Sequence, residues 1–259
     1  MPPLFTIEKF QAPDITDTML SETAALFSSA YGIWGPLAPK ETGGRCKTGT
    51  RIRISPRLLR AQHFPPGGQT SLVRCFDAGG RLVGHVVASR WGCEGRGVCW
   101  VTQLCVIPAF RRVGVATKML RALKDPHTPT PTPTPTPTIH GILSSHPAAL
   151  LATLRAFGSG IENLDLETVR RRARAVMDGS PIDYVRGAKL VGRLFEQEDG
   201  DGSGSGDGSG NASVCCADTA FWVDHAEPLA ALDVVRERGV AWPFGELREG
   251  CEFLVLVES

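Results

Sequence analysis

The segment 101–123 contains the residues whose types and spacing are best suited to holding a charged ligand. A strand-like apolar run is followed by a short loop with Gly114 and Ala116, and then by a helix-like pattern. Small residues at the mouth of a helix let backbone N–H groups approach an anion, and the helix dipole favours negative charge there. Arg111 and Arg112 can neutralise further charge at the rim. The pattern predicts a pyrophosphate-binding loop.

Two other phosphate-binding loops fit this segment poorly. A dinucleotide-binding turn needs GxGxxG with an acidic residue about twenty positions onward, and a P-loop needs Gly-Lys-Ser/Thr. The segment has neither pattern. An ordinary strand-to-helix loop with a surface arginine pair is the remaining alternative.

The motif Arg111-x-x-Gly114-x-Ala116, after a strand that ends in Val106-x-Pro108, resembles the acetyl-CoA-binding motif of the GNAT superfamily of N-acetyltransferases. The segment 141–158 resembles the next element of that family, a strand followed by a helix beside the pantetheine arm. The resemblance implies that acetyl-CoA is held by Leu104, Cys105, Val106, Arg111, Arg112, Val113, Gly114, Val115, Ala116, Thr117, Ser144, Ser145 and His146.

In GNAT enzymes the amine attacks the thioester directly, so the resemblance implies three chemical needs. The amine must be neutral, the developing oxyanion must be stabilised, and the leaving thiolate must gain a proton. The family takes its oxyanion donor from a backbone N–H on the strand before the loop. That position corresponds to Leu104, Cys105 or Val106.

The first candidate for the general base is His140, because it begins the strand before Ser144, where some relatives hold a glutamate. A hydrogen-bonded structural histidine is the alternative. Gln103 cannot accept the proton but could orient a water molecule. His85 and the neighbouring pair Asp224-His225 are weaker options.

The general acid is a departure from the family pattern, which often places a tyrosine on the helix after 145–147. Ala152 and Thr153 occupy those positions here, and the chain has only two tyrosines, Tyr31 and Tyr184. We expect Tyr184 to supply the proton, with plain packing as the alternative. His146 either touches the cofactor arm or caps the helix.

Composition restricts the other classes of function. The formal net charge is +1, and the only dense basic run is 170–174, so we expect no nucleic-acid partner. That run could meet cofactor phosphates or an anionic substrate, or form a solvated helix face.

The eight cysteines lack paired CxxC spacing, so we expect no metal site. The sequence has no long apolar span and no leader pattern, so we expect no membrane partner and a cytoplasmic location.

The positions of apolar residues predict the elements that carry these groups. Helices are expected over 16–30, 115–124, 147–157, 164–177, 182–195 and 228–238, with a loop-rich stretch over 31–68. Strands are expected over 71–76, 82–90, 98–107, 139–144, 219–223 and 252–257, the first three as a meander.

We therefore expect one α/β (α+β) domain over 1–259, with a GNAT-like, mixed and mostly antiparallel sheet flanked by helices. Three insertions interrupt it: a Thr-Pro repeat at 128–138, a helical segment at 161–198 and a flexible Gly/Ser/Asp loop at 199–213. Asp199 and Asp201 imitate a calcium loop, but its twelfth position is Gly210, which supplies no ligand.

The expected activity is transfer of an acetyl group from acetyl-CoA to a primary amine of a small molecule, amino acid or peptide. Two alternatives stay open. One is a catalytically silent module that binds acyl-CoA, and the other is an interaction protein recruited through its Thr-Pro repeat.

Overall fold

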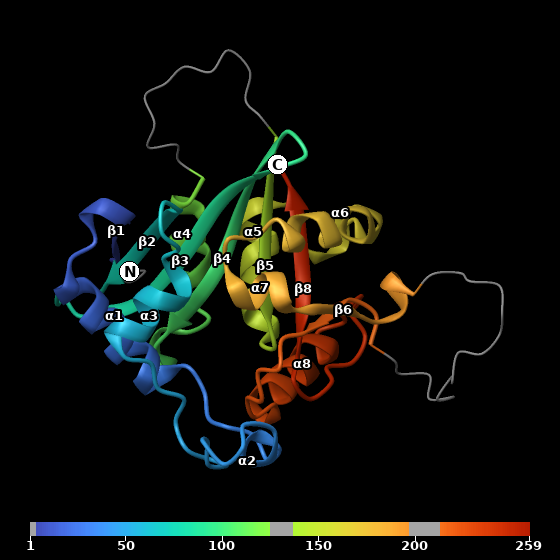
Figure 1. Ribbon diagram of the computed structural model, residues 1–259, viewed down its shortest axis with the longest axis horizontal. Helices are drawn as coiled ribbons and strands as arrows, with labels where there is room; N and C mark the ends of the chain where they lie inside the picture. Colours follow the sequence, from blue (N-terminus) through green and yellow to red (C-terminus); the bar gives the residue numbers. More distant parts are fainter. Residues whose placement is uncertain (1–3, 125–136, 197–212) are drawn as a thin grey trace.

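The computed structural model describes residues 4–124, 137–196 and 213–259. One sheet of eight strands has the order β1-β2-β3-β4-β5-β8-β7-β6 (Figure 1). Neighbouring strands are antiparallel except β4 and β5, which are parallel. This confirms the expected mixed, mostly antiparallel sheet. The strands are β1 (Thr6–Gln11), β2 (Gln69–Phe76), β3 (Leu82–Cys93), β4 (Arg96–Val106), β5 (Thr138–Ser144), β6 (Lys189–Val191), β7 (Cys216–Asp218) and β8 (Cys251–Glu258).

The helices cover both faces of this sheet. Leu72 and Val87, opposite each other on β2 and β3, pack with Leu20 and Leu59 of α1 and α3. Gly84 lies three positions before Val87, so it belongs to the other face, where a Cβ built on it would lie 2.9 Å from Met119 of α4. The helices are α1 (Asp17–Ala30), α2 (Ala38–Glu41), α3 (Pro56–His63), α4 (Val115–Ala122), α5 (Pro147–Phe157), α6 (Leu166–Asp178), α7 (Asp183–Gly187) and α8 (Ala226–Glu237).

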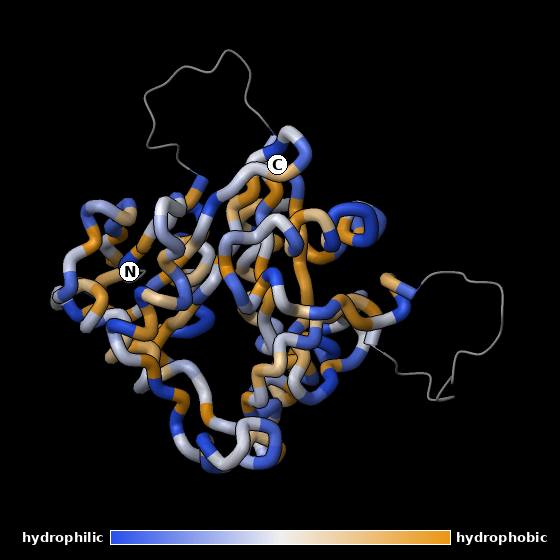
Figure 2. Tube along the Cα trace, in the orientation of Figure 1, coloured by the Kyte–Doolittle hydropathy of each residue, from blue (hydrophilic) through white to orange (hydrophobic). Residues whose placement is uncertain are grey.

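The core is continuous across the centre of the sheet. In Figure 2 the strand β8 is mostly orange, whereas the outer helix α6 carries a long hydrophilic stretch. Trp100 on β4 is fully buried and lies beside Gly141 on β5, its partner in the register. A Cβ at Gly141 would lie 2.3 Å from the Trp100 ring, so only glycine fits there.

Two predicted elements are wrong. The helix expected over 182–195 ends at Gly187, because Ala188 has an extended backbone with a ψ of 140° and leads into β6. Beyond β6, Gly192 takes a φ of +113° that no helix allows. The strand expected over 219–223 lies earlier, at β7, and Ala220 has a φ of +53°. In the expected range only Val223 forms a bridge, to Trp34.

The apolar pattern also missed elements. β1 pairs with β2 at the edge of the sheet, but its residues are only partly buried, so its pattern is weak. α3 lies within the stretch 31–68 that we expected to be a loop, and its helix is capped by Ser55. Most of the Thr-Pro repeat and of the Gly/Ser/Asp loop, including Asp199, Asp201 and Gly210, lies outside the described residues.

The described part of the chain has no helix long and apolar enough to cross a membrane. In the same ranges no group of three or more His, Cys, Asp or Glu side chains could hold a metal ion. The arginine run lies on α6, where Arg170 pairs with Glu167, and Arg172 pairs with Glu94 and Glu258.

Candidate active site

The central feature of the site is the divergence of the parallel strands β4 and β5. Their register ends at the pair Val101 and Ile142, although β4 continues to Val106 in contact with β3. A β-bulge leaves Thr102 between the residues that pair with Ala88 and Val87. Because a bulge bends its strand, β4 turns away from β5 at this point.

The register fixes which backbone groups of β4 face the diverging side. The N–H of Ile107 donates to the Val83 carbonyl at 3.0 Å, and hydrogen-bonded positions alternate in an antiparallel pair. Cys105 therefore directs its backbone toward β3, whereas Leu104 and Val106 direct theirs away. Beyond Val101, no described strand pairs with β4 on that side. Of the three predicted oxyanion donors, this geometry excludes Cys105 and keeps Leu104 and Val106, of which Leu104 lies nearer to the point where the strands separate.

The predicted pyrophosphate loop joins β4 to α4. Gly114 is the N-cap of α4 with a φ of +86°, and no side chain caps the helix. The first N–H groups of a helix have no partner within it, so those of the first turn can bind an anion. The space around Gly114 is open, since a Cβ built there would meet nothing within 4 Å. These residues fit a pyrophosphate group.

The two loop arginines differ in their surroundings. Arg111 donates to the carbonyls of Val106 at 3.0 Å and Ala30 at 2.8 Å, and it pairs with Glu227 of α8. It therefore braces the loop against α1 and α8, which we had not expected of a phosphate ligand. Arg112 is exposed and adopts a positive φ of 65°, so it is the more available cation.

The starts of α4 and α5 together form the mouth of the candidate cofactor site, and the start of α5 is its second side. The Ser144 hydroxyl accepts a hydrogen bond from the His146 N–H at 3.1 Å, and His146 Nδ1 accepts one from the Ala148 N–H. His146 is thus the helix cap, which is the alternative raised from the sequence. Its Nε2 lies 3.9 Å from the Glu227 carboxylate, and the neighbouring Ser145 is buried.

A hollow of about 440 Å³ extends from the first turn of α4 between α5 and α8. Thr117 lies at the end near the pyrophosphate loop. Three arginines, Arg121, Arg155 and Arg238, and one acid, Glu162, also line it. The surplus of positive charge suits a phosphorylated nucleotide.

The structure places His140 away from this site, contrary to our expectation. It pairs in register with Cys99, five residues before Leu104, which corresponds to roughly 16 Å along a strand. Its ring stacks on Phe157 at 3.9 Å, and Nε2 lies 3.0 Å from the Ser259 hydroxyl. Burial lowers its pKa to about 3. His140 is therefore a packed structural histidine.

The other predicted proton carriers are also held in structural contacts. His85 is fully buried, and its Nε2 lies 2.7 Å from Gln103 Oε1. Because an amide oxygen only accepts, Nε2 carries the hydrogen, and burial lowers the His85 pKa to about 4. Asp224 accepts a hydrogen bond from the Ala226 N–H, and His225 lies 3.8 Å from Glu249, so this pair organises the start of α8.

Tyr184 lies at the point where the two strands separate. Its hydroxyl donates to the carbonyl of Thr102, the bulged residue, at 3.1 Å. Its ring packs against His63 of α3, which places it on the α1 and α3 side of the sheet. Burial, and then the charge of Glu252, raise the Tyr184 pKa, so the hydroxyl keeps its proton near neutral pH.

Glu252 is the residue that sequence reasoning missed. It lies at the start of β8, only 5 % exposed, and its charge also raises the pKa of Tyr31. Burial raises the Glu252 pKa to about 7, opposed by a hydrogen bond with the Thr219 side chain. A lone carboxylate at the start of the apolar run 251–257 was the available signal. Buried carboxylates with such a pKa can exchange protons at neutral pH.

The family match agrees with this geometry. Residues 44–125, which include β4, the loop and α4, match the family model for the acetyltransferase (GNAT) family. The resemblance to the GNAT family is confirmed. Similarity of this segment to the GNAT family implies an acyl-CoA donor. No curated protein sequence matches the chain.

Solved acetyltransferase structures match part of the chain. An aminoglycoside acetyltransferase from an uncultured soil metagenomic sample is 22% identical, with a TM-score of 0.28, over 46% of this chain and 70% of that one. An aminoglycoside 6'-N-acetyltransferase from Acinetobacter baumannii is 15% identical, with a TM-score of 0.27, over 46% and 69%.

Proposed function

We propose that the protein transfers an acetyl group from acetyl-CoA to a primary amine by direct attack. The observation that carries this proposal is the divergence of β4 from β5 at Thr102, immediately before an uncapped, glycine-led α4. A thioester arm can enter between the strands while the first turn of α4 holds its pyrophosphate.

The donor is held by backbone groups more than by side chains. The N–H groups from Val113 to Thr117 face the pyrophosphate, Arg112 adds positive charge, and the hollow beside Arg121 and Arg155 takes the nucleotide end. When bound, acetyl-CoA supplies an activated acyl carbon and a thiolate leaving group. The Leu104 N–H can then hold the carbonyl oxygen as it gains negative charge.

Proton transfer is assigned to two residues on the α1 and α3 side of the sheet. Glu252 accepts a proton from the ammonium before attack, or from the amine as it attacks, since its pKa of about 7 leaves it partly ionised at neutral pH. As the C–N bond forms and the C–S bond breaks, the Tyr184 hydroxyl donates its proton to sulfur. Burial, and then the charge of Glu252, raise the Tyr184 pKa, so the hydroxyl holds its proton until the thiolate forms.

The test has a binding arm and a turnover arm. Calorimetric titration with acetyl-CoA measures donor binding, and thiol release with a panel of primary amines measures transfer. Binding without thiol release for any amine would favour the catalytically silent module. Absence of binding would overturn the proposal.

A matched pair of variants tests whether acetyl-CoA binds at the loop before α4. Val113 on the loop and Leu58 on α3 are both exposed apolar side chains, at 47 % and 44 %. Val113→Glu places a carboxylate against the pyrophosphate and should weaken acetyl-CoA binding by about tenfold or more. Leu58→Glu makes the same chemical change elsewhere and should leave the Kd unchanged.

A further inference from the structure

The segment 38–63 is strongly basic although the whole chain has a net charge of only +1. It holds seven Lys or Arg residues and one acid, Glu41. Lys40 pairs with Glu41, and Arg60 pairs with Asp17 of α1. In the described ranges the other five have no ion pair, and all five are exposed: Arg45, Lys47, Arg51, Arg53 and Arg57. Positive charge is therefore concentrated on one surface.

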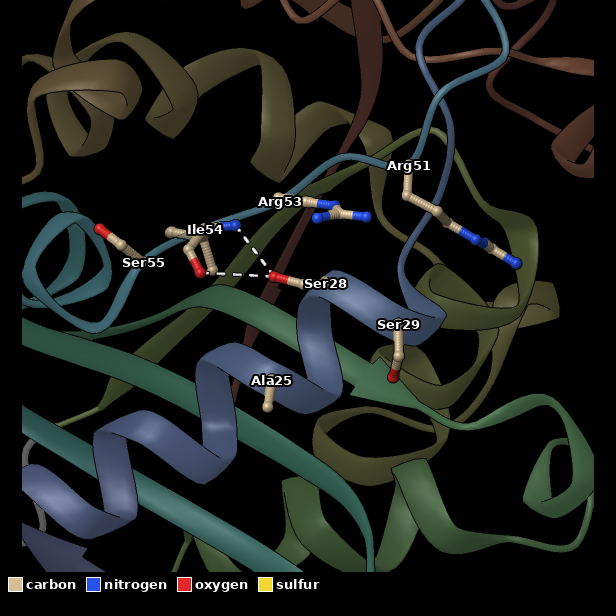
Figure 3. A pocket seen from close by; sticks show the side chains of 7 residues that line it. All are labelled: Ala25, Ser28, Ser29, Arg51, Arg53, Ile54 and Ser55. Carbon is tan, nitrogen blue, oxygen red and sulfur yellow. Dashed lines mark hydrogen bonds between the residues drawn. The ribbon is translucent and has the colours of Figure 1, made fainter.

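Two of these arginines line a hollow of about 690 Å³ between α1 and the segment 51–55 (Figure 3). Ser28 fixes this segment to α1, since its hydroxyl donates to the Ile54 carbonyl and accepts from the Ile54 N–H at 3.1 Å. Ile52 is buried, so the exposed Arg51 and Arg53 on either side of it lie on the outer surface of the segment.

The lining is suited to an anion. Ala25, Ser28, Ser29, Ile54 and Ser55 form the rest of it, and none of them carries a negative charge. Two guanidinium groups offer paired donors that match phosphate or carboxylate oxygens. The Ser28 and Ser29 hydroxyls donate to the carbonyls of Ile54 and Leu26, whereas the Ser55 hydroxyl accepts from the Leu58 N–H and can donate its proton to the anion.

The segment that carries the two arginines packs beside Tyr31. The Ile52 N–H donates to the carbonyl of Gly32 at 3.1 Å, and Arg51 forms a bridge with Ile33. Gly32 and Ile33 directly follow Tyr31 in the chain. Ile52 also belongs to the apolar cluster that packs against Tyr31. Strand spacings place Tyr31 roughly 10 Å from the backbone of the two arginines. Burial, and then the charge of Glu252, raise the pKa of Tyr31.

We propose that Arg51 and Arg53 dock an anionic group, a phosphate or a carboxylate, carried by the acceptor amine. This rests on the proposed function and specifies its acceptor class. A polycationic amine such as an aminoglycoside would meet five uncompensated positive charges on this surface, which disfavours its approach.

Turnover with three primary amines that share a six-carbon chain tests the preference for an anionic acceptor. They are 6-aminohexyl phosphate, 6-aminohexanol and 1,6-diaminohexane, each supplied with saturating acetyl-CoA. We expect kcat/KM for the phosphate to exceed that of the alcohol by about tenfold or more, and the diamine to be the poorest per amine group. Amines with a carboxylate in place of the phosphate then show which anion fits better. Equal values for the phosphate and the alcohol would overturn the proposal.

A matched control locates the site. The double variant Arg51→Gln, Arg53→Gln should lose the preference for phosphate, while Arg57→Gln, which removes an exposed arginine outside the hollow, should keep it. Equal losses in both would show a diffuse basic surface and overturn the proposal. A rise in the KM for acetyl-CoA instead of the acceptor would also overturn it.

A binding measurement separates this proposal from the proposed function. Calorimetric titration with 6-aminohexyl phosphate, without acetyl-CoA, needs no turnover. Binding that is lost in the double variant but kept in Arg57→Gln supports the anion site even if no amine releases thiol. Binding that is the same in all three proteins overturns the anion site even if thiol release proceeds.

Discussion

Arg111 on the pyrophosphate loop is ion-paired with Glu227 on α8, and the same carboxylate lies 3.9 Å from His146 at the start of α5. A negative charge therefore lies between the two helix starts that form the proposed cofactor mouth. Such a charge opposes the binding of an anionic ligand, because like charges repel at short distance.

Glu227→Gln should strengthen acetyl-CoA binding by a few fold, since it removes this charge but keeps the size of the side chain. The gain should shrink at high salt, because the carboxylate is 59% exposed and its field is screened. Calorimetry at two ionic strengths measures both. Asp233→Asn on the same helix, where Asp233 pairs with Arg236, is the matched control and should have no effect. Weaker binding in Glu227→Gln would instead mean that Glu227 positions Arg111 for the ligand.

Glu252→Gln should reduce kcat by about 10²-fold or more while leaving the Kd for acetyl-CoA unchanged, because only proton acceptance is removed. In the parent protein the rate should rise with pH through about 7, where Glu252 ionises. That rise should disappear in the variant. Glu258→Gln, on the same strand but outside the site, should keep the parent pH profile. An unchanged profile in Glu252→Gln would assign the base elsewhere.

Glu252 should also make stability depend on pH. Its pKa is raised from 4.5 to about 7 on folding, so the folded state binds the proton more tightly than the unfolded state. The free energy of unfolding should therefore fall as pH rises from about 4.5 to 7, by at most on the order of 3 kcal/mol. Urea denaturation at pH 5 and pH 8 measures this, and Glu252→Gln should flatten the difference. The same change in the free energy of unfolding between pH 5 and pH 8 in both proteins would contradict the raised pKa of Glu252.

The cofactor half of the site could be predicted from the sequence because it depends on backbone. A glycine at a helix start and an apolar strand before it are local features, and the structure has both at Gly114 and β4. The role of Arg111 could not be predicted from the residues next to it in the sequence. Its partners, Ala30 and Glu227, are distant in sequence, and no spacing around Arg111 predicts them.

The proton-transfer residues were harder to predict because they are brought together by the sheet. Tyr184, which the sequence did suggest, reaches β4 only because α7 is short and packs beside α3. Glu252 is separated from Tyr184 by more than sixty residues, part of which lies outside the described ranges. His140 looked suitable by position, but strand register rather than chain order fixes its distance from Leu104.

Tyr184→Phe should lower kcat by roughly tenfold to a hundredfold, since it removes the proton for the leaving sulfur but preserves the packed ring. The loss should be smaller with an acetyl thioester whose thiol is more acidic, because that thiol leaves without protonation. A structural role alone would lower both rates equally. Tyr31→Phe is the matched control: its ring stacks on Phe27 at 4.3 Å, and it should show no dependence on the leaving group.

Gly141→Ala should destabilise the protein by about 1–3 kcal/mol, because a Cβ there would lie 2.3 Å from the fully buried Trp100 ring. The two residues belong to the last stretch in which β4 and β5 still pair, so the ring cannot move without shifting the point where the strands separate. Urea denaturation measures the loss, and acetyl-CoA affinity should fall with it. Gly97→Ala on β4 is the control, since its nearest neighbour would lie 3.5 Å away. If the variant kept its stability but bound acetyl-CoA more weakly, the Trp100 ring would have moved and widened the separation between β4 and β5.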